Sequence, residues 1–506
     1  MFNNVNIDAA FGMTSKILLD EITPDGAPVF TLEVPNSTQS HLKRDSDQLV
    51  TSFSSKSELA INLSTDRRFL TFMGYPAPVA AIDVSNSSTP RVIDPTNADS
   101  QVFNRVVAKV DQSGHFTFTK TNAFSGDNGR GAILNAEANV AYMAGNAGDG
   151  QQDPQQPGVI IGGGVQILPL VNKPLSAQDP GDPSPVGSFN VTELGLDADK
   201  VGKDTNFRGV KIFNDVVYLT KGSGSNGIDT VYFIDTSGST NPADPTASPR
   251  ACPNGTGLPA PGAKLPTAPL PFTAGTLQIV GVTPYNMCIL NGFNTEGTDD
   301  SNVFPFGIWF ANATTAYVSD EGDGKFSNKN GADPYAHVAG QTQAGLQKWV
   351  LSDGVWKQVY VLTNGLGLGV PYTVAGYPTG TNPLNKNLPW APTTDGLRNL
   401  TGRLNRDGTV TIWAVTSVAS GSGDNGADPN MLVAITDTLD ATTLPADEAF
   451  KTVLPATFGQ LYRGVAFAPG TTDAAAAPAG SGNGNGNGNK GNGNDKGNGN
   501  GKAKGH

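Results

Sequence analysis

Residues 208–235 read RGVKIFNDVVYLTKGSGSNGIDTVYFID. The stretch contains an apolar run, a tight polar turn, a second apolar run, a glycine-rich loop and a third apolar run. The apolar runs are rich in Val, Ile, Tyr and Phe, and Gly, Asn and Asp bound them, which is the pattern of short β-strands joined by turns. The stretch therefore predicts three consecutive strands with a long loop before the third.

The same order of strand, turn, strand and loop recurs along the chain, so the stretch is one unit of a degenerate repeat. Further copies begin at Arg130, Phe306 and Leu397, and two of the loops share the sequence Asn-Gly-Ala-Asp-Pro, at 330–334 and 425–429. A fourth strand follows in several copies. Four antiparallel strands per unit, repeated around an axis, form the blades of a β-propeller. We therefore expect an all-β fold that is a single β-propeller.

The number of blades follows from the inner strands, which are expected near residues 58–63, 130–134, 208–213, 305–310, 397–403 and 461–467. No further strands follow the last of these, so strands near 16–22 and 29–34 are expected to complete its blade and close the ring. This predicts six blades, or seven if the Pro/Gly-rich stretches 252–275 and 365–393 hold further strands. A pair of β-sandwiches would explain the strands but not their common order, and a parallel β-helix would need shorter repeats.

The composition agrees with short strands and long loops. Of the 506 residues, 37% are hydrophobic and only 15% charged, and the chain has 62 Gly and 36 Pro. Such low charge with many turn-forming residues does not fit a helical protein. We assign residues 1–469 to the propeller. Residues 470–506 are rich in Gly and Asn and have almost no apolar side chains, so they are expected to be a disordered tail.

Charge and hydropathy restrict the partners. The net charge of −12 argues against binding to nucleic acid or to an anionic membrane. No apolar run of about 18 residues occurs, so no transmembrane segment is expected. An extracellular or cell-surface location and a monomeric state are expected. The N-terminus lacks a basic region followed by an apolar one, so this location implies a leader that is absent from this chain.

The two cysteines, Cys252 and Cys288, lie in one Pro/Gly-rich stretch. They can form a disulfide bond that closes this loop in an oxidising compartment. They can equally be two unpaired structural thiols, and the sequence leaves both open.

Strand order also predicts where charged side chains gather. If each inner strand starts at one face of the ring, the second strand returns to that face. The arginines that open inner strands and the acidic glycine loops then share a face. Guanidinium groups suit carboxylates and phosphates, so these arginines predict an anion-binding funnel. Alternatively, each arginine pairs with an Asp or a backbone carbonyl of the next blade. The arginines are Arg130, Arg208, Arg398 and Arg463.

The acidic loops are candidate calcium sites, because calcium takes six to eight oxygen ligands on loops that glycine can bend. The densest group is Asp320, Glu321 and Asp323. The weaker candidates are Asp149, Asp153, Asp424 and Asp428. No loop matches the helix-flanked calcium motif, and Asp-Gly and Asn-Gly pairs are also favoured wherever a turn needs a positive φ.

No catalytic motif stands out. The chain has four histidines and lacks paired His or Cys ligands for zinc, and it has no Gly-x-Ser-x-Gly element between a strand and a helix. Aromatic residues recur in the second strand of each unit, where packing between blades is a simpler explanation than a sugar platform. They are Tyr142, Tyr218, Tyr317 and Trp413.

The blade pattern, with its Arg-Gly-Val starts and the closing segment Tyr462–Phe467, resembles secreted bacterial β-propeller proteins in general. The resemblance implies the fold and the extracellular compartment. Some such proteins are calcium-dependent hydrolases and others are binding modules, and the sequence leaves open whether this chain is an enzyme. We expect a ligand-binding or adhesive scaffold with calcium in its loops. The alternative is a calcium-dependent hydrolase of a phosphoester or lactone at the channel mouth.

Overall fold

The computed structural model describes residues 12–39, 48–53, 57–90, 101–146, 165–170, 185–187, 206–222, 228–238, 252–253, 255–268, 286–297, 302–328 and 333–471. Over these residues the chain is all-β, with one short α-helix, α2 (Pro334–Ala339), and one 3-10 turn, η2 (Val84–Asn86). Asp149, Asp153 and residues 472–506 of the predicted tail lie outside this part of the chain. No helix in the described part is both long and apolar enough to cross a membrane.

Five four-stranded antiparallel sheets follow one another along the chain, and we call them blades 1 to 5. Blade 1 is β5 (Asn62–Leu63), β6 (Phe69–Gly74), β7 (Arg105–Asp111) and β8 (Phe116–Thr121). Blade 2 is β9 (Gly129–Asn135), β10 (Val140–Gly145), β11 (Val165–Pro169) and β12 (Pro185–Gly187). Blade 3 is β13 (Phe207–Phe213), β14 (Val216–Lys221), β15 (Thr230–Ile234) and β16 (Met287–Ile289). Blade 4 is β17 (Pro305–Asn312), β18 (Thr315–Asp320), β19 (Gly345–Ser352) and β20 (Val355–Leu362). Blade 5 is β23 (Thr393–Leu404), β24 (Thr409–Ala419), β25 (Leu432–Thr438) and β26 (Lys451–Leu454).

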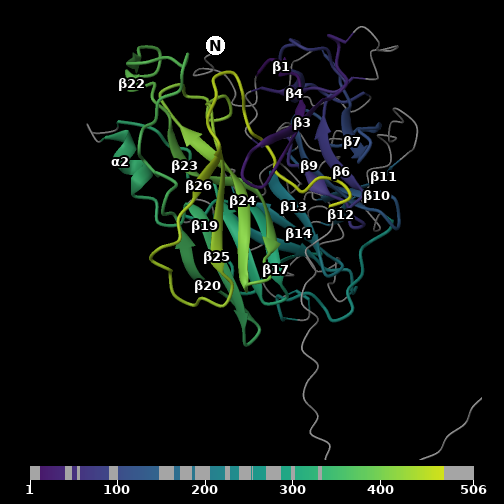
Figure 1. Ribbon diagram of the computed structural model, residues 1–506. Coiled ribbons are helices and arrows are strands. Elements are labelled where there is room, and N and C mark those ends of the chain that lie inside the picture. The colour runs from purple at the N-terminus through teal and green to yellow at the C-terminus, as the bar shows by residue number, and fades with distance from the viewer. Residues whose placement is uncertain are drawn as a thin grey trace, which may run out of the picture.

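Two-residue turns set the strand register of two hairpins, β13–β14 and β19–β20. Asn214 and Asp215 both have positive φ between β13 and β14, and so do Asp353 and Gly354 between β19 and β20. Such turns match the right-handed twist of the strands that they join. Figure 1 shows blades 4 and 5 on one side of the molecule, blades 1 and 2 on the other and blade 3 between them.

The predicted propeller is therefore confirmed, but the predicted count of six or seven blades is wrong for the described residues, which hold five. Residues 461–467 have the sequence of an inner strand, yet they belong to no sheet. The N-terminal strands β2 (Leu18–Ile22) and β3 (Pro28–Glu33) pair only with each other. The remaining short pairs are β1 (Thr14–Ser15) with β4 (Thr51–Ser52) and β21 (Thr381–Asn382) with β22 (Leu388–Pro389).

The terminal segments nevertheless fill the space between blades 5 and 1. Trp413 of β24 donates from Nε1 to Pro24 O at 2.9 Å, in the turn of the β2–β3 hairpin. Tyr462 and Val465 pack with Trp413 in one apolar cluster, and Ala466 packs against the blade 1 core. Side-chain packing, rather than a shared sheet, joins the ends of the ring.

The inner strands approach one another closely at glycines that follow the blade-opening residues. A Cβ atom on Gly209 would lie 2.8 Å from Phe306 O, and one on Gly307 would lie 2.9 Å from a Leu400 methyl carbon. A Cβ atom on Gly464 would lie 2.5 Å from Leu59 O. These positions form a narrow neck, because backbone passes backbone at Gly209 and Gly464 and the Leu400 side chain fills the space at Gly307.

Apolar side chains between the blades form the core. The four recurrent aromatic residues are all buried in clusters between sheets, which supports the packing role expected for them. They are Tyr142, Tyr218, Tyr317 and Trp413.

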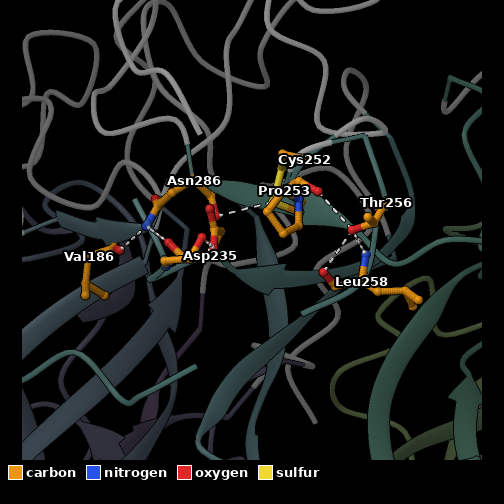
Figure 2. The surroundings of a disulfide bond; sticks show 9 residues. Val186, Asp235, Cys252, Pro253, Thr256, Leu258 and Asn286 are labelled. Carbon is orange, nitrogen blue, oxygen red and sulfur yellow. Dashed lines mark hydrogen bonds between the residues drawn. A yellow bond between two sulfur atoms is a disulfide. The ribbon is translucent and has the colours of Figure 1, made fainter. Parts of the chain in front are cut away.

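Cys252 and Cys288 form a disulfide bond, with their Cα atoms 5.5 Å apart. The bond attaches the segment that follows blade 3's third strand to its fourth strand, β16 (Figure 2). Beside it, Asn286 donates from Nδ2 to Asp235 O at 2.9 Å and to Val186 O at 3.1 Å, which links blade 3 to blade 2. The fourth strand of blade 3 is thus held covalently and by hydrogen bonds to two blades.

Loss of the disulfide should lower stability. The two cysteines are 36 residues apart, and the chain-entropy model assigns about 4 kcal/mol to closing such a loop. We expect the double variant Cys252→Ser/Cys288→Ser to melt at a lower temperature than the unreduced protein. A reductant should lower the melting temperature of the native protein and leave that of the double variant unchanged. Equal effects of the reductant on both proteins would contradict this assignment.

The stability lost on a Gly→Ala substitution in the neck should depend on the space around the added methyl group. Gly464→Ala places a methyl group 2.5 Å from a backbone oxygen, so we expect about 1–3 kcal/mol of destabilisation. At Gly131 the nearest atom is the Ala60 methyl carbon at 3.1 Å. The destabilisation caused by Gly131→Ala should be largely offset, because Gly→Ala reduces the conformational entropy of the unfolded chain and so stabilises the folded state by roughly 0.4–1 kcal/mol. Urea unfolding measures the free energy of unfolding of both variants. An equal loss of stability in Gly131→Ala and Gly464→Ala would contradict the close backbone approach at Gly464.

Candidate functional site

The arginines that open inner strands lie on β-bulges. In blade 2 the pairing skips Arg130, and in blade 3 it skips Arg208 with Gly209. The equivalent bulges hold Phe306 in blade 4 and Arg398 with Asn399 in blade 5. A bulge bends its strand and changes the direction of a side chain. The repeated bulge therefore gives these side chains a common position at the start of each inner strand.

Two of these arginines meet at Glu321, which follows β18. Arg398 lies 3.2 Å from Glu321 through Nε, and Arg208 lies 3.8 Å from it through Nη2. All three residues are buried. Arg208 also donates to Ser57 Oγ, just before blade 1, and its guanidinium carbon lies 5.9 Å from the centre of the Phe306 ring. Side chains from blades 3 and 5 thus converge on one carboxylate that follows a strand of blade 4.

Arg463, in the segment 461–467, completes this group. Its Nη2 donates to Gly426 O at 3.0 Å and to Phe53 O. Arg398 donates from Nη2 to the neighbouring Asn425 O at 3.2 Å, so one turn of the β24–β25 loop holds both guanidinium groups. We call Arg208, Glu321, Arg398 and Arg463 the mouth cluster.

The electrostatics of Arg463 are unusual for an arginine. Its side chain is buried, and burial lowers its pKa to about 10, with the charge of Arg398 acting in the same direction and Glu58 and Asp424 opposing it. Its Nη1 has no hydrogen-bond partner among the described residues. Burying a cationic nitrogen costs free energy unless a hydrogen-bond acceptor compensates for it.

Arg130 lies apart from this group. It donates from Nε to Asn128 Oδ1 at 3.0 Å and from Nη1 to Asn206, at the start of blade 3. This contact joins neighbouring blades, as the structural interpretation of the arginines expects. The structure thus brings three of the four predicted arginines together and places the fourth between blades 2 and 3.

The predicted calcium ligands already have protein partners. Asp320 accepts from Phe304 N at 2.6 Å, from Gly322 N at 3.0 Å and from Gln347 Nε2 at 3.2 Å. Asp323 lies 2.9 Å from His337 Nε2 and 3.5 Å from Lys325 Nζ. Glu321 pairs with the two arginines. No group of three or more His, Cys, Asp or Glu in the described part is arranged to hold a metal ion.

The two weaker candidates that lie within the described residues, Asp424 and Asp428, behave in the same way. Asp424 accepts from Gly426 N at 3.0 Å, and Asp428 accepts from Ser420 Oγ at 2.8 Å and from Tyr377 OH. These oxygens fold the loops, so the donor set does not favour a calcium ion. Calcium stays a prediction from the sequence.

Two acidic residues at the mouth were missed by the sequence analysis. Asp395 accepts from Gly324 N at 2.9 Å and from Gln341 Nε2 at 2.6 Å. Glu58 accepts from Tyr75 OH at 2.6 Å and from Ser52 N at 2.9 Å. Neither belongs to a motif. The available signal was position, because Glu58 opens the predicted inner strand 58–63 and Asp395 lies two residues before the predicted inner strand 397–403.

Burial raises the pKa of several of these carboxyl groups. The pKa is about 8 for Asp320, about 7 for Asp395 and for Asp424, and about 6 for Asp428. Desolvation is the largest cause in each case and exceeds the opposing effect of the hydrogen bonds that each carboxylate accepts. These acids therefore titrate near neutral pH.

These shifts predict that stability falls as pH rises. When the pKa of a carboxyl group is higher in the folded than in the unfolded protein, the folded protein binds more protons at pH values between these two pKa values. The free energy of unfolding therefore falls as the pH rises through this range. From about pH 5 to about pH 8.5 we expect a fall of at least roughly 1 kcal/mol. Urea unfolding across this range measures it. Asp320→Asn should reduce the slope, whereas the exposed control Asp407→Asn should not. A flat or rising profile would contradict the assignment.

No protein-family model matches this chain, and no curated protein matches it. Solved structures give weak similarities. One is a carbohydrate-active enzyme of family AA12 from Trichoderma reesei, with 11% identity, 86% of this chain and 99% of that chain covered, and a TM-score of 0.32. A protein from Lactobacillus plantarum has 10% identity, coverage of 72% and 80%, and a TM-score of 0.23. An ulvan lyase of family PL25 has 10% identity, coverage of 79% and 78%, and a TM-score of 0.26. Similarities of this size carry no argument about the function of this chain.

Proposed function

We propose that this protein is a secreted or cell-surface ligand-binding propeller whose mouth cluster holds an anionic group of the ligand. The observation that carries the proposal is the buried Arg463 Nη1, which has no hydrogen-bond partner among the described residues. An oxygen of a carboxylate or phosphate would supply the missing acceptor, and hydrogen bonds between charged groups are the stronger ones in proteins.

The charge balance of the mouth supports the same proposal. Arg208 and Arg398 share the single carboxylate of Glu321. Burial raises the pKa of Glu58, and the charge of the nearby Arg463 acts in the opposite direction. The pKa of the other nearby acid, Asp424, is about 7. The mouth cluster thus holds three guanidinium groups beside the carboxylate of Glu321, and an incoming anion would be attracted by their positive charge.

The disulfide bond supports the compartment, since such bonds persist mainly in oxidising environments. Calcium in the loops is retained from the sequence only as a prediction, so the binding experiment is run with EDTA present. A role for the mouth in adhesion has no separate support.

Removing the Arg463 charge tests the proposal. Binding of inorganic phosphate and of glucuronate is measured by calorimetry at constant ionic strength. We expect saturable binding to the native protein and binding at least about 10-fold weaker to Arg463→Gln, because one charge-assisted hydrogen bond is worth about 1.5–3 kcal/mol. The control Arg68→Gln removes a more exposed arginine that pairs with Asp66, and it should bind like the native protein.

Three other outcomes have distinct meanings. Equal binding to the native protein and Arg463→Gln would place the anion elsewhere. No binding of either probe would contradict the anion site. Hydrolysis of a phosphoester or lactone by the native protein, lost in Arg463→Gln, would instead support the hydrolase alternative at the same mouth.

A further inference from the structure

Lys211, on the inner strand β13 of blade 3, makes a contact across the ring. Its Nζ donates to Asn62 Oδ1 at 2.7 Å, on the inner strand β5 of blade 1. The inner strand of blade 2 lies between them, because a Cβ atom on Gly131 would lie 3.1 Å from Ala60 and 3.5 Å from Val210. The Lys211 side chain therefore reaches from blade 3 past blade 2 to blade 1.

The partner of Lys211 is fixed in place and neutral. Asn62 is buried, and its Nδ2 donates to Ala132 O at 3.1 Å, which leaves Oδ1 to accept from the amine. Among the described residues no carboxylate pairs with Lys211. Lys348 shows the contrasting arrangement, because this buried lysine of blade 4 lies 3.0 Å from Asp437 Oδ2.

An amine in such a setting loses its proton readily, because burial disfavours the charged form and a neutral acceptor does not restore it. Desolvation lowers the pKa of Lys211 to about 8, and no charged or titratable group in the described part of the chain acts on it. At pH 7.5 roughly a quarter of Lys211 is then the free amine, against on the order of 0.1% of an ordinary lysine. The free amine keeps N–H groups that can donate to Asn62, so the loss of the proton does not require the contact to break.

The position of Lys211 separates it from the mouth cluster. It follows Arg208 by three residues on β13, roughly 10 Å along an extended strand, and Gly209 of the neck lies between them. Lys211 is half-buried, whereas Val210 before it is buried. A small molecule can therefore approach Lys211 without passing the mouth, and a role for this amine does not rest on anion binding there.

We propose that Lys211 is a nucleophilic site that forms an imine with a small aldehyde entering the ring beyond the neck. The Nζ lone pair attacks the carbonyl carbon, the C=O π electrons move to oxygen, and the nitrogen gives that oxygen a proton. Loss of the hydroxyl group together with the second amine proton then leaves the C=N bond. Water is the only other product.

Reductive trapping with glycolaldehyde and cyanoborohydride tests the site. The full chain is labelled at pH 7.5 to low conversion, and peptide mass spectrometry measures the rate at each lysine. We expect Lys211 to react at least about 10-fold faster than the exposed Lys357 and Lys451, because far more of it is free amine. Lys211→Arg keeps a cation and a donor to Asn62, and it should lack only the fast adduct.

Asn62→Asp tests the electrostatic basis, since it places a carboxylate where the neutral acceptor lies. An adjacent carboxylate favours the ammonium form, so Lys211 should react about 10-fold more slowly in this variant, at a temperature below its melting transition. Lys357 and Lys451 should keep their native rates.

Three results would overturn the proposal. In the native protein, these are a Lys211 that reacts no faster than Lys357 and Lys451, or one that does not react at all. The third is an unchanged Lys211 rate in folded Asn62→Asp, because the neutral partner would then have no part in the reactivity.

Discussion

Backbone passes backbone at the neck of the ring without space for a Cβ atom, and the rest of the structure depends on this close approach. Gly209 lies against Phe306, and Gly464 lies against Leu59. Close contact at the axis draws the blades together, so that their faces meet and bury the aromatic residues between them. The adjacent bulges set the arginines just above the neck. Tight packing at the axis and the gathering of charge at the mouth therefore have one cause.

The sequence was sufficient for the blade pattern because a strand repeat is a local property. Short apolar runs, turn residues and the Arg-Gly starts predicted the propeller and the positions of its first five inner strands. The blade count failed at residues 461–467, which carry an inner-strand sequence but pair with no other strand. An apolar run indicates that a segment is buried and extended. It does not indicate whether a partner strand is available for the backbone.

The candidate site was predictable only in part, because its contacts join residues far apart in the chain. Glu321 was grouped with Asp320 and Asp323 as a metal ligand on local density. The structure instead pairs it with Arg208 and Arg398, from two other blades. Arg130 shares the Arg-Gly start of Arg208 but donates to Asn206 at a blade boundary. The local sequence identified the arginines at the starts of the inner strands. Their contacts with other blades, which the local sequence does not contain, distinguish the structural arginine from the candidate functional ones.

The ring is closed by side chains of the two terminal regions rather than by a shared sheet, which has a consequence for biosynthesis. The hydrogen bond from Arg463 to Phe53 O joins residues 410 positions apart. Contacts of such high sequence separation form slowly, since a long loop must be ordered first. During translation, blades 1 to 5 emerge before residue 463 leaves the ribosome. Until then the nascent chain exposes the apolar flanks of blades 1 and 5, and it relies on chaperones or on rapid completion to avoid aggregation.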